Sequence, residues 1–350
     1  MDSVKMIEVL SSAFGASGFE DDVVGAARGF VPQGYTARRD SLLNFYIERE
    51  RKAGLPLLLV EAHSDELGLM VQAIRPNGTL AVAPLGGWAH CALPAQRMRI
   101  KNLEGKFITG IVATKPPHLA GGGKSVPDIS ELSVDVGACS AEEVARVYKI
   151  DVGCPMVPCT QFEHHPEQDI IIGKAFDCRL GCAAVLDVLK AVSNMALEVD
   201  VVGTLSSQEE VGARGAAVAS KQLLPDAVIC FEGSPADDTF AEPVLSQSAL
   251  KKGPMLRHMD QGAITNPRFL RVAIDAAARA EIPYQQAVRT GGFTNASAYQ
   301  ALGIPTLVIS CPVRYIHSHN AIAALSDYTN AVALAVSILE TLNYDVISSF

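Results

Sequence analysis

Histidine and carboxylate residues follow several apolar runs of the chain at the point where each run ends. His63 comes shortly after the run 55–60, and the adjacent acids Glu209 and Glu210 come after the run 201–205. Imidazole nitrogens and carboxylate oxygens are common ligands of zinc, cobalt and manganese. The pattern predicts a site for two divalent cations. Its candidate ligands are His63, Asp177, Glu210, Glu232 and His317.

The acids around these ligands suggest catalytic roles. Glu209 and Glu210 are adjacent, so their side chains diverge, and one can hold a metal ion while its neighbour acts as general base in hydrolysis. Asp65 can accept the second ring N–H of His63 and orient that histidine. Each residue also has an ordinary alternative role, since acids favour helix N-termini and aspartate is a frequent N-cap.

Buried strands and helices alternate over the two ends of the chain. Continuous apolar runs predict strands buried on both faces over 55–60, 201–205, 227–231 and 306–310. Helical patterns cover 181–192, 212–223 and 267–280. The segment Ser17-Gly18-Phe19-Glu20 has the form of a capping box, which predicts the start of a further helix. These units are typical of an α/β domain.

Residues 69–165 have a different pattern of apolar and polar residues. Short alternating segments are separated by turns, of which Pro76-Asn77-Gly78 is a hairpin signal. We therefore predict an α/β fold: a three-layer α/β/α catalytic domain with a mixed sheet, formed by residues 1–68 and 166–350. A small barrel-like β domain, residues 69–165, is expected to interrupt it and to serve dimerisation.

Composition excludes several classes of partner. The net charge is -9 and no block of lysine or arginine stands out, so nucleic acid is not an expected partner. No apolar run approaches the roughly 20 residues that span a bilayer. An acid near the N-terminus argues against an export signal, so a cytoplasmic location is expected. The eight cysteines contain no CxxC pair. Cys178 adjoins Asp177, so a metal ion bound there could affect its thiol.

Several motifs occur together and in order along the chain. They are Glu61-Ala62-His63-Ser64-Asp65-Glu66, Gly86-Gly87-Trp88, Lys115-Pro116-Pro117-His118-Leu119, Asp135-Val136-Gly137-Ala138, Gln208-Glu209-Glu210-Val211-Gly212, Arg214-Gly215-Ala216 and Arg314-Tyr315-Ile316-His317-Ser318. With these motifs the sequence resembles, over nearly its whole length, the tetrahedral aminopeptidases. Members of that family are cytosolic dinuclear metallopeptidases, also described as glutamyl or deblocking aminopeptidases.

The resemblance implies a site and an assembly. One metal ion would be held by His63, Asp177 and Glu232, and the other by Asp177, Glu210 and His317, with Asp177 bridging. Glu209 would be the base. The ions would be zinc or cobalt, with manganese as a further option. The substrates would be short peptides, and subunits would associate as dimers into a hollow dodecamer.

Two positions depart from the family pattern. Glu232 stands where aspartate is usual, which could shift that metal position, and Asn295 stands where aspartate is common, near the expected substrate end. His319 is a rival to His317 as ligand. A pocket for acidic side chains could be lined by Arg257, His258 and Arg289, which could equally be surface or interface groups.

Two other functions fit parts of the sequence. Paired carboxylates could serve a glycoside hydrolase, and related sequences have been labelled endoglucanases, although one tryptophan gives little for stacking on sugars. A non-catalytic assembly or regulatory protein could also retain this fold. Dependence of amino-acid release on metal ions separates both alternatives from an aminopeptidase.

Overall fold

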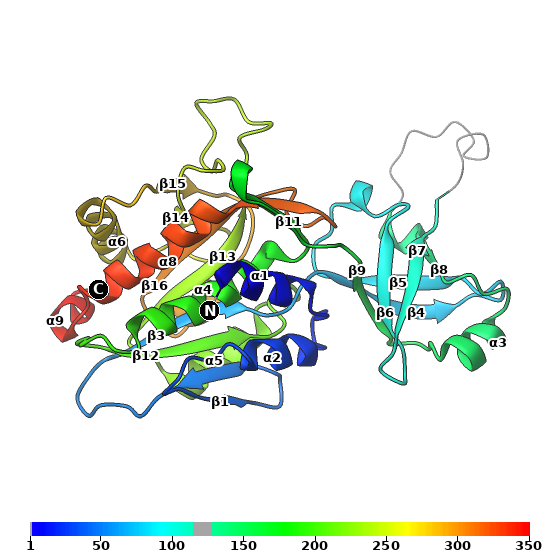
Figure 1. The fold of residues 1–350 in the computed structure, drawn as a ribbon, viewed down its shortest axis with the longest axis horizontal. Helices are drawn as coiled ribbons and strands as arrows, with labels where there is room; N and C mark the ends of the chain where they lie inside the picture. The colour runs from blue at the N-terminus through cyan, green and yellow to red at the C-terminus, as the bar shows by residue number, and fades with distance from the viewer. Residues whose placement is uncertain (1, 115–127) are drawn as a thin grey trace.

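The computed structural model describes residues 2–114 and 128–350. The motif Lys115-Pro116-Pro117-His118-Leu119 lies outside the described residues. Figure 1 shows a large α/β body on one side and a smaller β-rich unit on the other. Both termini belong to the α/β body.

A mixed sheet forms the centre of the α/β body. Its middle strands are parallel and run in the order β12 (Asp200–Ser206), β3 (Leu57–His63), β13 (Ala227–Pro235) and β16 (Thr306–Arg314). Antiparallel strands flank them: β2 (Phe45–Glu48) and β1 (Thr36–Arg39) on one side, and β17 (Ala321–Ala324), β11 (Ile170–Gly173) and β10 (Glu163–His165) on the other. β14 (Met255–Met259) branches from β16 and pairs with β15 (Gln285–Val288). The predicted mixed sheet is confirmed.

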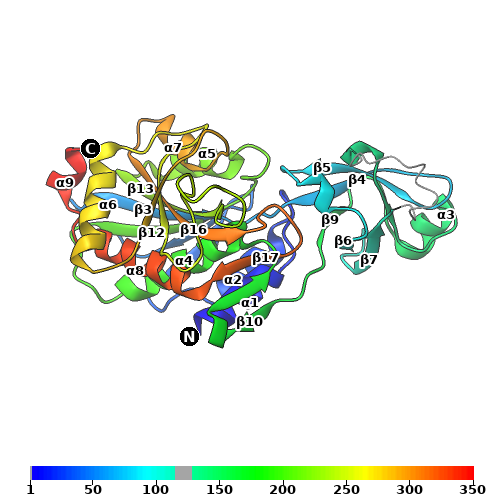
Figure 2. The same ribbon diagram turned by 90° about the horizontal axis from the view of Figure 1, so that it is seen from above.

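The alternation of side chains along β3 produces the three layers. Leu58 and Val60 pack into the main core, whereas Leu57 and Leu59 face a second cluster on the opposite side of the sheet. The main core is covered by α1 (Ser3–Ser12), α2 (Asp21–Arg28), α4 (Phe176–Val192), α6 (Pro267–Arg279) and α8 (Leu325–Leu339). The other face carries α5 (Arg214–Leu223) and α7 (Ala296–Gln300), as Figure 2 shows, while α9 (Tyr344–Ser348) ends the chain.

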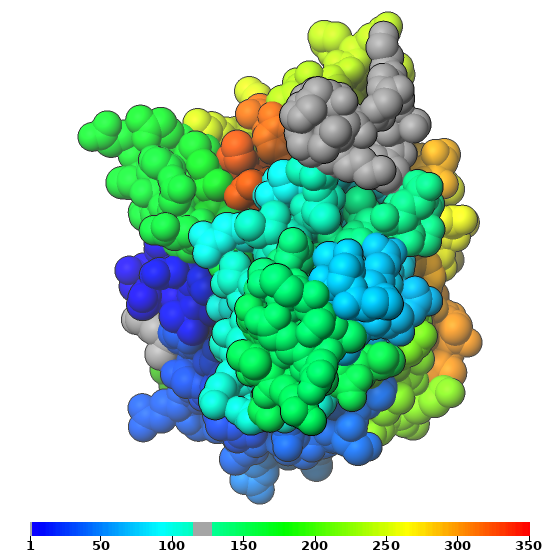
Figure 3. Space-filling view, turned by 90° about the vertical axis from the view of Figure 1, so that its right-hand side faces the viewer, coloured from blue at the N-terminus to red at the C-terminus, as the bar shows by residue number. Residues whose placement is uncertain are grey.

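The inserted unit is a closed antiparallel barrel. Its strands follow the order β4 (Gly68–Ile74), β5 (Leu80–Leu85), β8 (Ser133–Asp135), β7 (Phe107–Val112), β6 (Arg97–Lys101) and β9 (Pro155–Pro158). It has its own core around Leu69, Met98 and Val134. Ser140 caps the short helix α3 (Ala141–Glu143). Figure 3 views the molecule from the barrel end. The inserted β-barrel is thus confirmed, and its limits at 69 and 165 stay a prediction.

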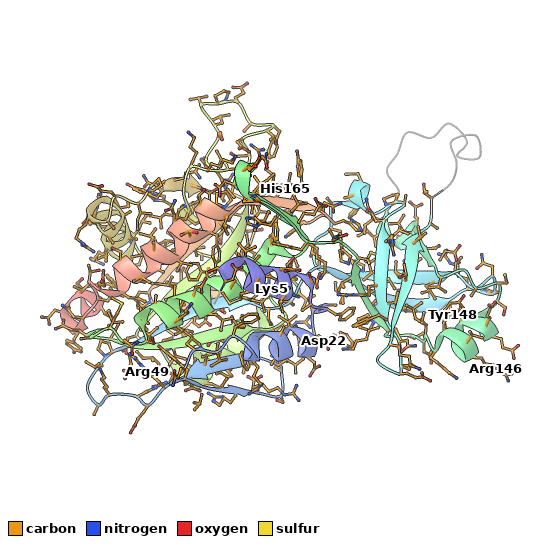
Figure 4. All side chains as sticks on the ribbon, in the orientation of Figure 1. Lys5, Asp22, Arg49, Arg146, Tyr148 and His165 are labelled. Carbon is orange, nitrogen blue, oxygen red and sulfur yellow. The ribbon has the colours of Figure 1, made fainter. Side chains whose placement is uncertain are left out.

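Side chains of the barrel hold it against the first two helices. Arg99 donates to the Ser12 carbonyl at 2.7 Å, and the Lys101 ammonium lies 3.0 Å from Asp22, which Figure 4 labels. The rings of Phe14 and Phe107 pack at a tilt of 35° with centroids 5.4 Å apart. These contacts fix the barrel beside the site-bearing edge of the sheet.

The predicted capping box at Ser17 is wrong, although the helix predicted to follow it is present as α2. Ser17 Oγ instead donates to Asp65 Oδ2 at 2.6 Å, and Glu20 Oε1 accepts from the backbone N–H groups of Gly18 and Gln208. Both side chains are buried, and they bond to Asp65 and to the backbone of Gln208, which are distant in sequence, and do not cap the helix. Among the described helices, none has the length and apolar character needed to cross a membrane.

Candidate metal centre

Strand register brings the first ligands together. His63 ends β3 opposite Ser206 of β12, and Glu232 of β13 is level with it because Cys230 pairs with Glu61 two residues earlier. His63 Nε2 lies 3.1 Å from Asp177 Oδ1 and 3.3 Å from Glu232 Oε1. All of these strands are parallel, so their carboxyl ends meet at one edge of the sheet, where open α/β folds bind ligands.

Asp177 stands between the two histidines. Its Oδ1 faces His63, while its Oδ2 lies 3.2 Å from His317 Nε2, and that nitrogen is 4.0 Å from Glu210 Oε2. Donor atoms bound to one zinc ion at about 2.0–2.2 Å lie roughly 3.3 Å apart in a tetrahedral arrangement. The separations on the two sides of Asp177 are of that order, so each oxygen of the carboxylate can serve a different ion.

Asp65 organises the site from behind. Its Oδ1 is 3.3 Å from His63 Nδ1 and accepts the Glu209 N–H at 2.9 Å, while Oδ2 accepts the Glu210 N–H at 3.2 Å and the Ser17 hydroxyl. Burial alone would raise the pKa of Asp65, but these hydrogen bonds and the adjacent imidazole lower it. One ionised carboxylate therefore fixes both the histidine and the turn that carries the two glutamates.

The remaining acids are crowded and buried. Burial raises the pKa of Glu210 and of Glu232 to about 8, and the Asp177 carboxylate adds to both shifts. Burial also raises the pKa of Glu209, with further contributions from Glu232 and Glu210. Within the described residues, Glu210 Oε1 and Glu232 Oε2 are buried without a hydrogen-bond partner. Such carboxylates fit cations, which would satisfy these oxygens and balance the charge.

A cavity of about 570 Å³ opens beside this cluster. It is lined by Glu209, Glu210, Glu232 and His317, and also by Arg257, Arg289 and Phe293. Arg257 pairs with Asp260 at 3.0 Å, and Arg289 pairs with Asp237 at 2.8 Å. His258 is directed elsewhere, with Nε2 2.9 Å from the Gln286 side chain. Two of the three expected pocket residues therefore reach the cavity.

Asn295 does not line the cavity, although Phe293 does, and its expected place near the substrate end stays a prediction. Asn295 is the residue before α7, and its fully buried side chain packs against the sheet, where Nδ2 donates to Glu61 Oε1 at 2.7 Å and to Ser206 Oγ at 2.8 Å. Burial raises the pKa of Glu61 to about 7, and the hydrogen bonds from Asn295, Ser206 and Cys230 oppose that shift. Asn295 thus supports the strand ends beneath the site. The sequence pattern placed the residue in the right motif but could not show which way it points.

His319 is separate from the ligand cluster. It is 3% exposed, and its ring lies 5.7 Å from that of Trp88. In the part of the chain that the structure describes, neither ring nitrogen has a hydrogen-bond partner. The geometry therefore places His317, and not its rival two residues later, beside Asp177.

Acid should destabilise the protein through His319. Burial lowers the pKa of His319 from 6.5 to about 4, so between those pH values the unfolded chain binds more protons than the folded one. We expect this group to reduce the free energy of unfolding by up to roughly 3 kcal/mol as the pH falls through that window. His319→Phe keeps the packing on Trp88 but cannot bind a proton. Urea unfolding at pH 7 and at pH 4.5 should therefore show a smaller drop in the free energy of unfolding for this variant than for the unaltered protein. The partly exposed His165 (Figure 4) supplies the control His165→Phe, and equal acid sensitivity of all three proteins would contradict the prediction.

Sequence reasoning missed residues that act through Asp65 and the strand ends. Ser17 and Glu20 hold the turn at residues 208–210, yet in the sequence they have only the form of a helix cap. Glu61 belongs to a quoted motif, but no role was predicted for its carboxylate, which is fully buried. A glutamate placed directly after the apolar run 55–60 is the signal that could have revealed it.

An α/β/α fold with histidines and carboxylates at the carboxyl edge of its sheet defines a protein whose site can hold divalent cations. Residues 44–334 match the M42 glutamyl aminopeptidase family, and the chain belongs to that family and is an aminopeptidase. It is 32% identical to the glutamyl aminopeptidase of Lactococcus lactis, over 99% of both chains.

Solved structures agree with the fold. The TET aminopeptidase of a marine-sediment archaeon of the Thaumarchaeota superposes with a TM-score of 0.93 at 30% identity, over 99% of both chains. The TET1 peptidase of Pyrococcus horikoshii, which can assemble into a tetrahedron or a large octahedral shell, superposes with a TM-score of 0.88 at 25% identity, over 97% of this chain and 100% of that one. The resemblance inferred from the motifs is confirmed.

Proposed function

We propose that the protein is a metal-dependent aminopeptidase that uses two divalent ions, zinc or cobalt with manganese as an alternative, to hydrolyse short peptides. His63, Asp177 and Glu232 hold one ion, and Asp177, Glu210 and His317 hold the other. The observation that carries this proposal is the position of Asp177, whose two oxygens lie 3.1 and 3.2 Å from different imidazoles.

The reaction divides among residues of the chain. When bound, the two ions supply Lewis acidity toward the scissile carbonyl and lower the pKa of water. Glu209, at the edge of the cavity, accepts the proton of the attacking water and then donates it to the leaving amine. Burial raises the pKa of Glu209, which helps its carboxyl retain the proton between these two steps. Asp65 keeps His63 and Glu209 in place through its Oδ1.

The cavity favours an acidic N-terminal residue. Arg257 and Arg289 both line it, and within the described residues the Nε of each is buried without a partner. Guanidinium groups suit carboxylates because they present several donors in a fixed plane. Asp260 and Asp237 already balance part of this charge, so we expect a preference for acidic residues without strict exclusion of others. The name of the L. lactis relative agrees with such a preference.

We also propose that the chain self-associates in the cytoplasm, as dimers that build a dodecamer. The support is the similarity to the P. horikoshii peptidase, which can assemble into a tetrahedron or a large octahedral shell. A hollow assembly would admit peptides and exclude folded proteins by size. Light scattering of the purified chain measures the subunit number directly.

Metal removal tests the proposed function. The purified protein should contain about two equivalents of metal, and a chelator should abolish release of glutamate from a chromogenic amide, because each ion is needed for the reaction. Zinc or cobalt should restore that release. Reducing-sugar release that persists in chelator would instead support a glycoside hydrolase. A protein that binds no ion even when metal is supplied in excess would support a non-catalytic scaffold.

A further inference from the structure

The two metal positions differ in their donors. Around His63, a fourth side chain joins Asp177 and Glu232, because the Cys178 Sγ belongs to a group whose ligand atoms all lie within 4.8 Å of one another. The group on the other side of Asp177 offers three donors, from Asp177, Glu210 and His317. A structural zinc position typically has four protein donors, whereas a catalytic one keeps a place open for water or substrate.

The two positions also differ in access to solvent. Cys178 is fully buried, and His63 and Glu232 are almost so. The His317 side chain is 37% exposed and lines the cavity, as do Glu210 and Glu232. The position with the thiol is therefore the more buried of the two, here called the enclosed position, and the position with His317 is more open to substrate.

A second observation marks the enclosed position as a cation site. Glu232 is 4% exposed, and its Oε1 faces His63 Nε2 at 3.3 Å. In the described part of the chain, its other oxygen, Oε2, is buried without any hydrogen-bond partner. A buried carboxylate oxygen without a donor is costly unless a cation satisfies it.

The fold makes room for the sulfur at this place. Cys178 Sγ donates a weak hydrogen bond to the Phe231 carbonyl at 3.3 Å, next to Glu232 in the chain. A Cβ atom at Gly181 would lie only 2.4 Å from that sulfur, so the glycine leaves the space that the thiol occupies. The sulfur is thus held between α4 and the end of β13.

We propose that Cys178 is a fourth protein ligand at the position formed by His63, Asp177 and Glu232. This inference rests on the proposed two-metal function. On coordination, the S–H proton leaves to solvent, the hydrogen bond to Phe231 breaks and a sulfur–metal bond forms. Thiolate is a soft ligand, so this position selects zinc or cadmium over manganese. The position of Glu210 and His317 has nitrogen and oxygen donors only and stays open for the reaction.

Cobalt reconstitution of the full-length chain tests the thiol. Protein stripped with chelator and loaded with two equivalents of Co²⁺ should show a thiolate-to-cobalt charge-transfer band in the near ultraviolet. Cys178→Ser should lose the band and bind its first equivalent of Cd²⁺ at least about tenfold more weakly, with Mn²⁺ affinity little changed. Cys182→Ser is the matched control, because that thiol is equally buried on the same helix and donates to the His63 carbonyl at 3.0 Å.

The outcomes separate this proposal from the proposed function. A band that persists in Cys178→Ser, or a cobalt-loaded and active protein without a band, overturns the thiol ligand and leaves the two-metal enzyme standing. A chain that binds no metal overturns both. If Cys178→Ser does not fold, cadmium NMR of the unaltered protein decides, since a sulfur ligand moves the cadmium resonance strongly downfield and its absence at that position rules the thiol out.

Discussion

Glu209→Gln is expected to retain two metal ions and to lose about 10² to 10⁴ in kcat, the range of general-base contributions. The amide has the size of the carboxyl but cannot accept the proton of water. The backbone N–H of residue 209 would still donate to Asp65, so the turn should keep its shape. Single-turnover hydrolysis of a glutamyl amide, with metal content measured on the same sample, checks both parts.

The neighbouring acid provides the matched comparison. Glu210→Gln alters a proposed ligand, whose Oε2 is 4.0 Å from His317 Nε2, and should lose metal as well as activity. Different metal contents of the two variants would support the division between base and ligand. Unchanged turnover in Glu209→Gln would end its assignment as the base, whatever the behaviour of Glu210→Gln.

Asp177→Asn should lower metal content below one equivalent and reduce kcat/KM by roughly 10³-fold or more, because the electrostatic help of a metal pair amounts to several kcal/mol. One substitution affects both positions, since the two oxygens of Asp177 face different histidines. The amide presents a nitrogen on one side and carries no charge. Metal analysis after dialysis against zinc, together with peptide hydrolysis, measures the effect.

Asp187→Asn is a control on the same helix. Asp187 accepts hydrogen bonds from Ser3 Oγ and Tyr328 OH, both at 2.7 Å, so its change should cost about 1 to 3 kcal/mol of stability and leave metal content unchanged. If Asp177→Asn kept two equivalents and near-normal hydrolysis, a bridging carboxylate would be ruled out. If both variants lost metal alike, the loss would reflect helix α4 and not the ligand.

Glu66 has a different role from the residues beside it in its motif. It follows Asp65 directly and belongs to the same polar segment, yet its carboxylate points away from the cluster toward Lys174 and Arg179, at 2.5 and 3.1 Å. All three side chains are buried. Burial lowers the pKa of Lys174 to about 8, and the Glu66 carboxylate opposes that shift. This ion group connects the end of β3 with the start of α4, and so supports the placement of both His63 and Asp177.

The sequence by itself determined the elements and the candidate ligands. Apolar periodicity predicted β3, β12, β13 and β16, because buried parallel strands need continuous apolar runs. The polar residues that follow those runs were then expected at the carboxyl edge of one sheet, which is why His63 and the pair Glu209 and Glu210 could be named as candidates. Near residue 69 the continuous apolar runs give way to short segments in which apolar and polar residues alternate. That alternation is typical of strands with one exposed face, so it predicted the barrel.

Only the tertiary structure decided the directions of the side chains. Ser17 bonds to Asp65 and does not cap a helix, Asn295 supports Glu61 within the sheet, and His319 packs on Trp88 while His317 meets Asp177. In each case the competing arrangement satisfies local rules equally well. The choice depends on partners tens to hundreds of residues away, which become neighbours only when the strands pair and exclude water from the site.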